Sequence, residues 1–175
     1  LDYLFVDEAG QGAIANLIAM SRSAKNLILM GDQMQLGQPS QSAHPADSGL
    51  SVLDYLLSET ATISADMGVF LGTTYRMHSQ VNQFISDHIY EGKLHPHPDN
   101  DIRVIDVPAD YEGPLNMNAG VLFIPVEHEG NTQASEEEVG KIKELADALI
   151  GRSFHTGLNH PRERAIGWDD ILFVA

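Results

Sequence analysis

The chain has 175 residues, a length that suits one ordinary domain or two incomplete ones, and 43% of them are hydrophobic, enough for a core. No apolar run approaches the roughly 20 residues that a membrane helix needs, and no signal peptide pattern opens the chain, so we expect a cytoplasmic protein without a membrane partner. The absence of cysteine excludes disulfides and thiolate metal sites. A net charge of −15, with only ten Lys and Arg residues, argues against the binding of nucleic acid by this chain alone.

The first thirty residues predict an α/β unit. Residues 3–6 and 27–30 are apolar runs typical of parallel strands that are covered on both faces, and residues 13–21 between them predict a helix. Each strand is followed by polar residues. Because the carboxyl ends of parallel strands form the ligand crevice of an open sheet, we expect both polar clusters to lie there.

The first polar cluster, Asp7-Glu8, matches a Walker B pattern. Such a pair can hold Mg²⁺ on nucleotide phosphates through Asp7 and place Glu8 to orient or deprotonate a water. Taken alone, an acidic pair after a strand equally often caps a helix or faces solvent. In the second cluster, Gly31 permits a sharp turn that lets Asp32 and Gln35 face the crevice, with a solvated turn as the alternative.

The sequence contains no G-x-x-x-x-G-K-[ST] loop, so we expect the phosphate-binding loop upstream of Leu1. A core strand is predicted at residues 171–175, where the sequence stops. Both features predict that the chain is a fragment.

In the middle of the chain, Ser48 is predicted to cap a helix that runs to Leu57, and a short strand is predicted at 69–71. A second helix follows, with apolar residues at helical spacing up to Ile89 and with Gly92 as its stop.

Before that second helix, Tyr75-Arg76-Met77-His78 supplies a candidate arginine finger. Its guanidinium could neutralise charge that builds on a γ-phosphate, whereas a lone arginine is ordinarily a surface residue. We expect His78 to cap the helix or to pack locally rather than to take part in the chemistry. The close pair His95 and His97 is held extended by prolines and lacks a third ligand, so we expect no metal there.

The remaining residues predict an irregular segment at 95–118, a strand at 121–126, and a long loop at 152–168 that carries three arginines. Between the last two, Ser135 and Glu138 form an S-x-x-E capping box ahead of a helix. Its apolar face would carry five residues: Val139, Ile142, Leu145, Ala146 and Leu149.

The order VDEAGQ, GDQMQL and YRMHSQVNQFISDHIYEGKL over residues 1–94 resembles motifs II, III and IV of superfamily 1 helicases of the 5′-to-3′ branch. The tail, with HEGNTQASEEEV and ILFVA, resembles the start of a second RecA-like domain. More narrowly, the chain looks like the helicase half of bacterial proteins fused to a RecB-like nuclease. The resemblance implies a P-loop NTPase (RecA-like) parallel sheet with flanking helices, with residues 1–68 ending domain 1 and residues 69–175 beginning domain 2.

The resemblance also implies ATP and Mg²⁺ as cofactors, and single-stranded DNA as the partner, with RNA left open. Asp7 would then coordinate Mg²⁺ and Glu8 would activate the hydrolytic water. Gln11 would touch the nucleotide near its γ-phosphate. Asp32 and Gln35 would couple that phosphate to the nucleic-acid channel.

The same resemblance assigns Arg76 the role of the finger from the second domain. Relatives commonly carry Gln where this chain has Thr74, which departs from motif IV. Motifs V and VI are absent, so the isolated chain is expected to lack ATPase, helicase and nuclease activity. The competing hypothesis is an interaction module on a degenerate ATPase fold, which strong acidity and a missing phosphate loop would also suit.

Overall fold

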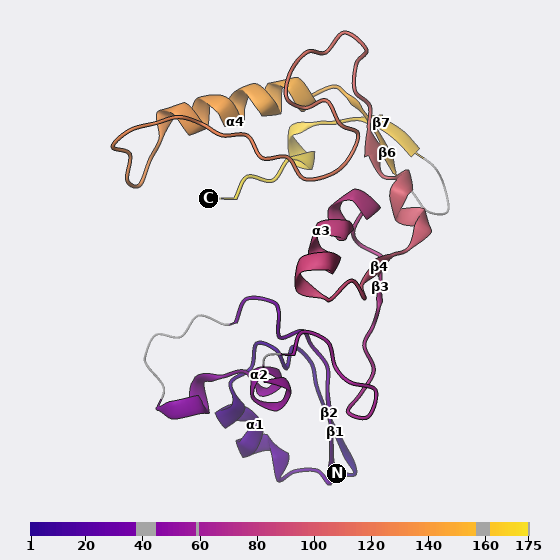
Figure 1. Ribbon diagram of the computed structural model, residues 1–175, viewed down its shortest axis with the longest axis vertical. Helices are drawn as coiled ribbons and strands as arrows, with labels where there is room; N and C mark the ends of the chain where they lie inside the picture. The colour runs from indigo at the N-terminus through magenta and orange to yellow at the C-terminus, as the bar shows by residue number, and fades with distance from the viewer. Residues whose placement is uncertain (38–44, 59, 157–161, 175) are drawn as a thin grey trace. The chain divides into compact units, whose positions relative to one another are not determined.

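The computed structural model describes residues 1–37, 45–58, 60–156 and 162–174 (Figure 1). The chain divides into two compact units. The first contains Leu1–Leu71 and His88–Glu91, and the second contains Gly72–Asp87 and Gly92–Ala175. Both are mixed α/β with small sheets. Within the described residues, no helix combines the length and apolarity that crossing a membrane requires.

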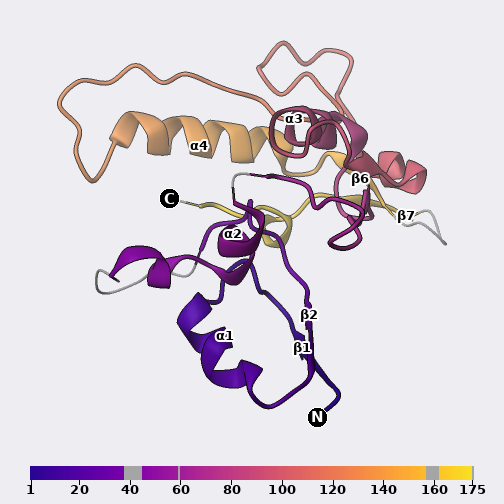
Figure 2. The same cartoon turned by 60° about the horizontal axis from the view of Figure 1, so that its bottom comes forward.

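The first unit begins with the predicted strand, helix and strand: β1 (Tyr3–Val6), α1 (Ile14–Ser21) and β2 (Asn26–Leu29). The two strands pair in parallel, with Leu4 opposite Leu27, and they lie side by side in both views (Figures 1 and 2). The parallel α/β arrangement predicted for this segment is therefore confirmed.

The expectation that both faces of these strands are covered is wrong for the described structure. Tyr3 and Phe5 are 58% and 62% exposed. Only the other face contributes to a core, because alternate residues of a strand point to opposite sides. That core consists of Ala9, Leu53 and Leu57, with Val6, Leu29 and Ile63 packed against it. The covering layer comes mainly from one short helix.

This short helix is α2 (Val52–Leu57), and it follows a 3₁₀ turn, η1 (Ala46–Gly49). The predicted cap at Ser48 is wrong. Ser51 caps the helix instead, because its hydroxyl accepts a hydrogen bond from the Asp54 amide at 3.1 Å.

In the second unit, β3 (Thr73–Thr74) pairs in parallel with β4 (His95–Pro96), and η2 (Pro98–Ile102) follows. The strand predicted at 69–71 is wrong, since the backbone bonds to 95–97 begin at Gly72. The helix α3 (Ser79–Ile89) agrees with the prediction, although its last two residues belong to the first unit. Gly92, with φ +73°, ends it by donating to the Ser86 carbonyl at 2.8 Å.

A three-stranded antiparallel sheet joins β5 (Val104–Ile105), β6 (Ser153–Thr156) and β7 (Arg162–Ala165) (Figure 1). The loop predicted at 152–168 is therefore wrong. Its described residues form two paired strands followed by η3 (Trp168–Asp170), and residues 157–161 of the predicted loop lie outside the described residues. Polar side chains also link β6 to β7, since the Ser153 hydroxyl donates to Glu163 Oε1 at 2.9 Å.

The strands predicted at 121–126 and 171–175 are not formed by the described residues, which end at 174. Val121, Phe123 and Leu172 are 67%, 88% and 86% exposed. An apolar run becomes a strand only when a neighbour pairs with its backbone, and no described strand does so here.

The helix α4 (Glu136–Leu149) is confirmed, with Ser135 accepting from the Glu138 amide at 3.2 Å. Of its predicted apolar face only Ala146 is buried. Just beyond it, Arg152 is buried, stacks 4.2 Å from the centre of the Tyr111 ring, and donates to the Leu115 carbonyl. This arginine fastens the end of α4 to the preceding irregular segment.

Candidate functional site

The turn after β1 presents two exposed carboxylates. The Glu8 amide donates to Asp7 Oδ1 at 3.0 Å. Glu8 has φ +54°, a left-handed conformation that is strained for a residue other than glycine. Its carbonyl accepts from the amides of Gln11 and Gly12, and Gln11 Nε2 donates to Glu8 Oε2 at 3.3 Å. These bonds hold Asp7, Glu8 and Gln11 together at the carboxyl end of β1.

Two glycines bring the turn after β1 into contact with the turn after β2. The Ala9 amide donates to the Met30 carbonyl at 2.8 Å. A Cβ at Gly10 would lie 2.2 Å from the carbonyl oxygen of Asp32, and one at Gly31, where φ is +154°, would lie 2.8 Å from the Ala9 nitrogen. Only glycine permits backbones to approach so closely. The two predicted polar clusters therefore lie against each other.

The Asp32 carboxylate is fully engaged. Its Oδ1 accepts from the Met34 amide at 3.0 Å, and its Oδ2 accepts from Gln35 Nε2 at 3.1 Å and from the Tyr90 hydroxyl at 2.5 Å. Burial and the neighbouring Asp32 raise the pKa of Tyr90 far above its usual range. Tyr90 therefore stays protonated and acts as a donor.

Tyr90 was missed by the sequence interpretation, which treated the residues after α3 only as a helix stop. It follows α3 in the chain but belongs to the first unit, where its ring contacts Phe70 at 6.2 Å between ring centres. Glu91 beside it accepts from the Thr62 hydroxyl at 3.0 Å. A tyrosine next to an acidic residue gives no periodic signal that would reveal such a contact.

Arg76 lies in the second unit, on the exposed loop between β3 and α3. Its amide donates to Thr74 Oγ1 at 3.2 Å. Within the described part of the chain, its guanidinium has no hydrogen bond or ion pair. The loop thus fixes the backbone of Arg76 and leaves its charge available.

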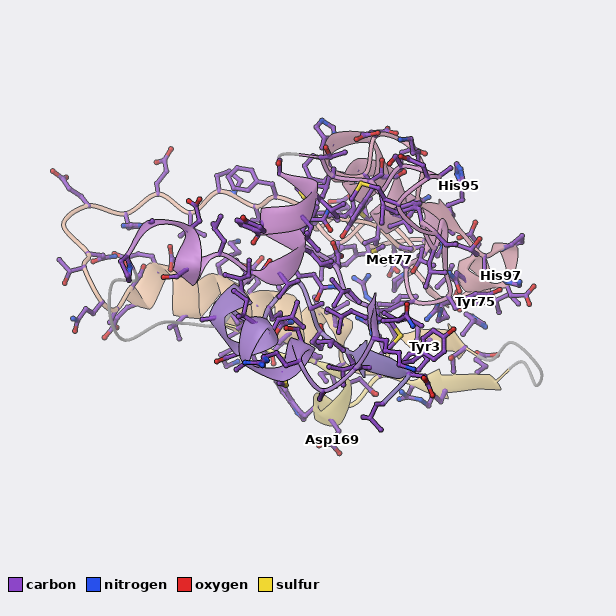
Figure 3. All side chains as sticks on the ribbon, turned by 90° about the horizontal axis from the view of Figure 1, so that it is seen from below. Tyr3, Tyr75, Met77, His95, His97 and Asp169 are labelled. Atoms are coloured by element: carbon purple, nitrogen blue, oxygen red, sulfur yellow. The ribbon has the colours of Figure 1, made fainter. Side chains whose placement is uncertain are left out.

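The side chain of Asn100 holds this loop in place. It is fully buried, and its Nδ2 donates to the carbonyls of Thr74 and Met77, each at 2.8 Å. Arg103 donates to the Tyr75 carbonyl at 3.2 Å. The Tyr75 ring stacks on His97, with 4.7 Å between ring centres, and both residues are labelled in Figure 3. Asn100 and Arg103 gave no signal in the sequence beyond a polar run after proline.

The start of α3 is also capped as predicted. His78 Nδ1 accepts from the Gln80 amide at 3.2 Å, and Asp101 accepts from the Ser79 amide at 2.8 Å. The bond from Ser79 lowers the pKa of Asp101. His97, by contrast, caps η2 by accepting from the Asp99 amide.

The structure thus brings five of the six predicted site residues to one edge of the first unit: Asp7, Glu8, Gln11, Asp32 and Gln35. The sixth, Arg76, is held separately in the second unit. Carboxylates and amides at the carboxyl ends of parallel strands are typical of a site for a phosphorylated ligand with its cation.

Comparison with known proteins supports that interpretation. A family described as an AAA domain matches residues 50–161, and the viral superfamily 1 RNA helicase core domain matches residues 1–98. Membership of these helicase-domain families implies a P-loop NTPase fold. The second match spans all three helicase-like motifs, and the chain belongs to the superfamily 1 helicases.

Curated relatives include a probable helicase, MAGATAMA 3, of Arabidopsis thaliana, 34% identical over 53% of this chain and 11% of that protein. The Drosophila melanogaster regulator of nonsense transcripts 1 homolog is 34% identical over 52% of this chain and 8% of that protein. The ATP-dependent helicase NAM7 of Saccharomyces cerevisiae is 33% identical over 52% of this chain and 9% of that protein. The chain aligns with only about a tenth of each relative. No solved structure matches it.

Proposed function

We propose that this chain is part of an ATP-dependent helicase that couples ATP hydrolysis to movement along single-stranded nucleic acid. The observation that carries the proposal is the contact between the turns after β1 and β2, which Gly10 and Gly31 permit. This contact juxtaposes the carboxylates of motif II with Asp32 of motif III, as a site that both binds and senses a phosphate would need.

The donor set fits Mg²⁺. Asp7 offers an exposed carboxylate in which one oxygen accepts from the Glu8 amide and the other has no partner among the described residues. Hard cations of this kind prefer such oxygen ligands. We assign Asp7 to hold Mg²⁺, which when bound neutralises phosphate charge. Glu8 would orient the attacking water and accept its proton, and Gln11 would contact the nucleotide near its γ-phosphate.

Asp32 and Gln35 form the coupling element of the proposal. They are hydrogen-bonded to each other, and Tyr90 ties the Asp32 carboxylate to the segment after α3. A change at the nucleotide that displaces the Gln35 side chain would therefore also displace that segment, through Asp32 and Tyr90. Arg76 would serve as the arginine finger, because its loop is fixed while its guanidinium is unengaged by described residues.

RNA is the polymer that the comparisons favour. One matching family is described as viral superfamily 1 RNA helicases, and one relative is named as a regulator of nonsense transcripts. DNA is the second candidate, and it derives from the resemblance to nuclease-fused bacterial helicases. The matched names mention no nuclease, so the comparisons add no support to that narrower resemblance.

The test is ATP hydrolysis by the longer protein that contains this chain, with single-stranded RNA, with single-stranded DNA and without either. The Glu8→Gln variant should lose at least about a hundredfold in rate, the scale on which a general base contributes. Glu129→Gln, at an exposed loop residue of the second unit, is the matched control and should hydrolyse normally. Greater stimulation by RNA would decide the polymer.

Two outcomes would contradict the proposal. Hydrolysis in neither the parent nor Glu8→Gln would favour the degenerate interaction module instead. Equal hydrolysis in both would remove Glu8 from the chemistry. Release of labelled nucleotides from DNA in the same samples would test for a fused nuclease.

A further inference from the structure

Three potential metal ligands come from three successive segments of the antiparallel sheet in the second unit. His155 on β6 lies directly opposite Glu163 on β7 and Val104 on β5. Asp106 comes two residues after Val104 and therefore extends the same face, since side chains alternate along a strand. The register of the sheet thus gathers Asp106, His155 and Glu163 on one face.

The side chains converge as well as the backbone positions. His155 Nε2 lies 2.9 Å from Asp106 Oδ2, and one ligand atom from each of the three residues lies within 4.8 Å of the others. Two atoms bound to one tetrahedral zinc ion at about 2.1 Å lie roughly 3.4 Å apart. Small side-chain rotations at half-buried or exposed positions would close the remaining gap.

A supporting contact orients the third ligand. The Ser153 hydroxyl donates to Glu163 Oε1 at 2.9 Å, from the same face of β6. Hydrogen bonds of this kind from neighbouring residues commonly fix ligating carboxylates around protein metal ions. The other Glu163 oxygen is then left for a cation.

We propose that Asp106, His155 and Glu163 form a binding site for a divalent transition-metal ion of the zinc class. One imidazole with two carboxylates suits zinc better than Mg²⁺ or Ca²⁺, which prefer oxygen ligands throughout. Three protein ligands leave a coordination position for water, because the face is open to solvent. The inference does not rest on the proposed helicase activity.

The simplest competing account is an ordinary ion pair between His155 and Asp106. The chain offers a control for this account, because His128 Nε2 lies 3.3 Å from Glu138 Oε1 in a second pair. The side chains of His128 and His155 are both 33% exposed, and their partners Glu138 and Asp106 are 54% and 55% exposed. Among the described residues, this second pair has no third ligand that completes a cluster. An ion pair alone should therefore make both histidines equivalent toward zinc.

The experiment is calorimetric titration of Zn²⁺ into the 175-residue chain at a fixed pH of about 7.5, because metal ligands must lose their protons to bind. We expect one ion per chain whose affinity falls at least tenfold in His155→Ala and in Glu163→Gln. His128→Ala should bind Zn²⁺ as the parent does. Ser153→Ala should weaken binding about tenfold, as the loss of a supporting hydrogen bond commonly does.

Glu163→Gln keeps the size of the side chain and an oxygen that can accept from Ser153, so an unchanged circular dichroism spectrum would separate lost zinc binding from lost folding. Substitution of Co²⁺ gives a second readout, because its visible absorption reports the ligand set. Equal Zn²⁺ affinity in His155→Ala and the parent, or an equal loss in His128→Ala, would overturn the proposal.

Discussion

Replacing the buried Asn100 by Asp tests whether one amide holds the arginine loop. Asn100 has 0% exposure, and its Nδ2 supplies hydrogen bonds of 2.8 Å to the carbonyls of Thr74 and Met77. Aspartate has the same shape but no donor when ionised. The Met77 carbonyl then loses its partner, the Thr74 carbonyl keeps only the bond from the His97 amide, and both face an anion.

The magnitude follows from these contacts. The Met77 carbonyl is left without a partner, which costs about 1–3 kcal/mol, and the loss of one of two bonds at the Thr74 carbonyl adds about 1 kcal/mol, so the two give about 2–4 kcal/mol. Asn100 Oδ1 already lacks a partner among the described residues, so none of them donates a hydrogen bond that would stabilise the new carboxylate. We therefore expect a loss in the upper half of that range, about 3 kcal/mol or more, in the free energy of unfolding at neutral pH.

The assay is urea unfolding followed by the fluorescence of Trp168, the single tryptophan, which lies in the second unit. The exposed Asn118→Asp is the matched control and should change stability by no more than about 0.5 kcal/mol. Burial beside carbonyls should raise the folded-state pKa of an aspartate at position 100 above its unfolded value of about 3.9.

A raised pKa gives the pH dependence its sign. The protonated form can still donate one hydrogen bond, so the variant should be closest to the parent below about pH 4 and should lose stability as the pH rises. A loss below about 1 kcal/mol at pH 7, or one that does not change with pH, would refute the role assigned to Asn100.

Three other contacts are each tested by substitution. Tyr90→Phe removes a hydroxyl donor from the motif III carboxylate and should cost the first unit about 2 kcal/mol, measured by hydrogen exchange, whereas an unchanged exchange pattern would contradict it. The Arg164 guanidinium lowers the pKa of Asp170 to about 2, so their contribution to stability is present above about pH 4 and lost as the pH falls through about 2. Asp170→Asn should flatten the pH profile of thermal unfolding in that window, and an unaltered profile would exclude the pair as its source. Gly10→Ala should force the two site turns apart and lower the melting temperature, while Gly140→Ala, with open space around its Cβ, should raise it; equal effects would show that the turns do not need glycine.

The elements that the sequence predicted well carry strong local signals in their own residues. β1 is an uninterrupted apolar run and β2 is one after Asn26, and α3 and α4 combine helical spacing with a capping residue before the first turn. The gathering of Asp7 and Asp32 was predictable for the same reason, because parallel strands deliver their carboxyl ends to one edge.

The elements that the sequence did not predict depend on partners distant in the chain. In β6 and β7, Ser153 donates to Glu163 and the Arg164 guanidinium lies over the Phe154 ring across the pair, so no apolar alternation marks these strands. Residues 121–126 show the converse, since an apolar run without a described partner strand stays irregular. Asn100 acts through one amide, and no periodicity can report a single side chain.

The arginine loop shows how a departure from a motif can be accommodated locally. Thr74 stands where relatives commonly carry Gln, yet its hydroxyl accepts from the Arg76 amide and its carbonyl accepts from Asn100. A threonine hydroxyl that binds a backbone amide two residues on closes a tight turn by itself. The position of Arg76 in its loop is therefore set by Thr74, Asn100 and Arg103 of the second unit, without the longer glutamine side chain. For that reason Thr74 does not weaken the proposed role of Arg76.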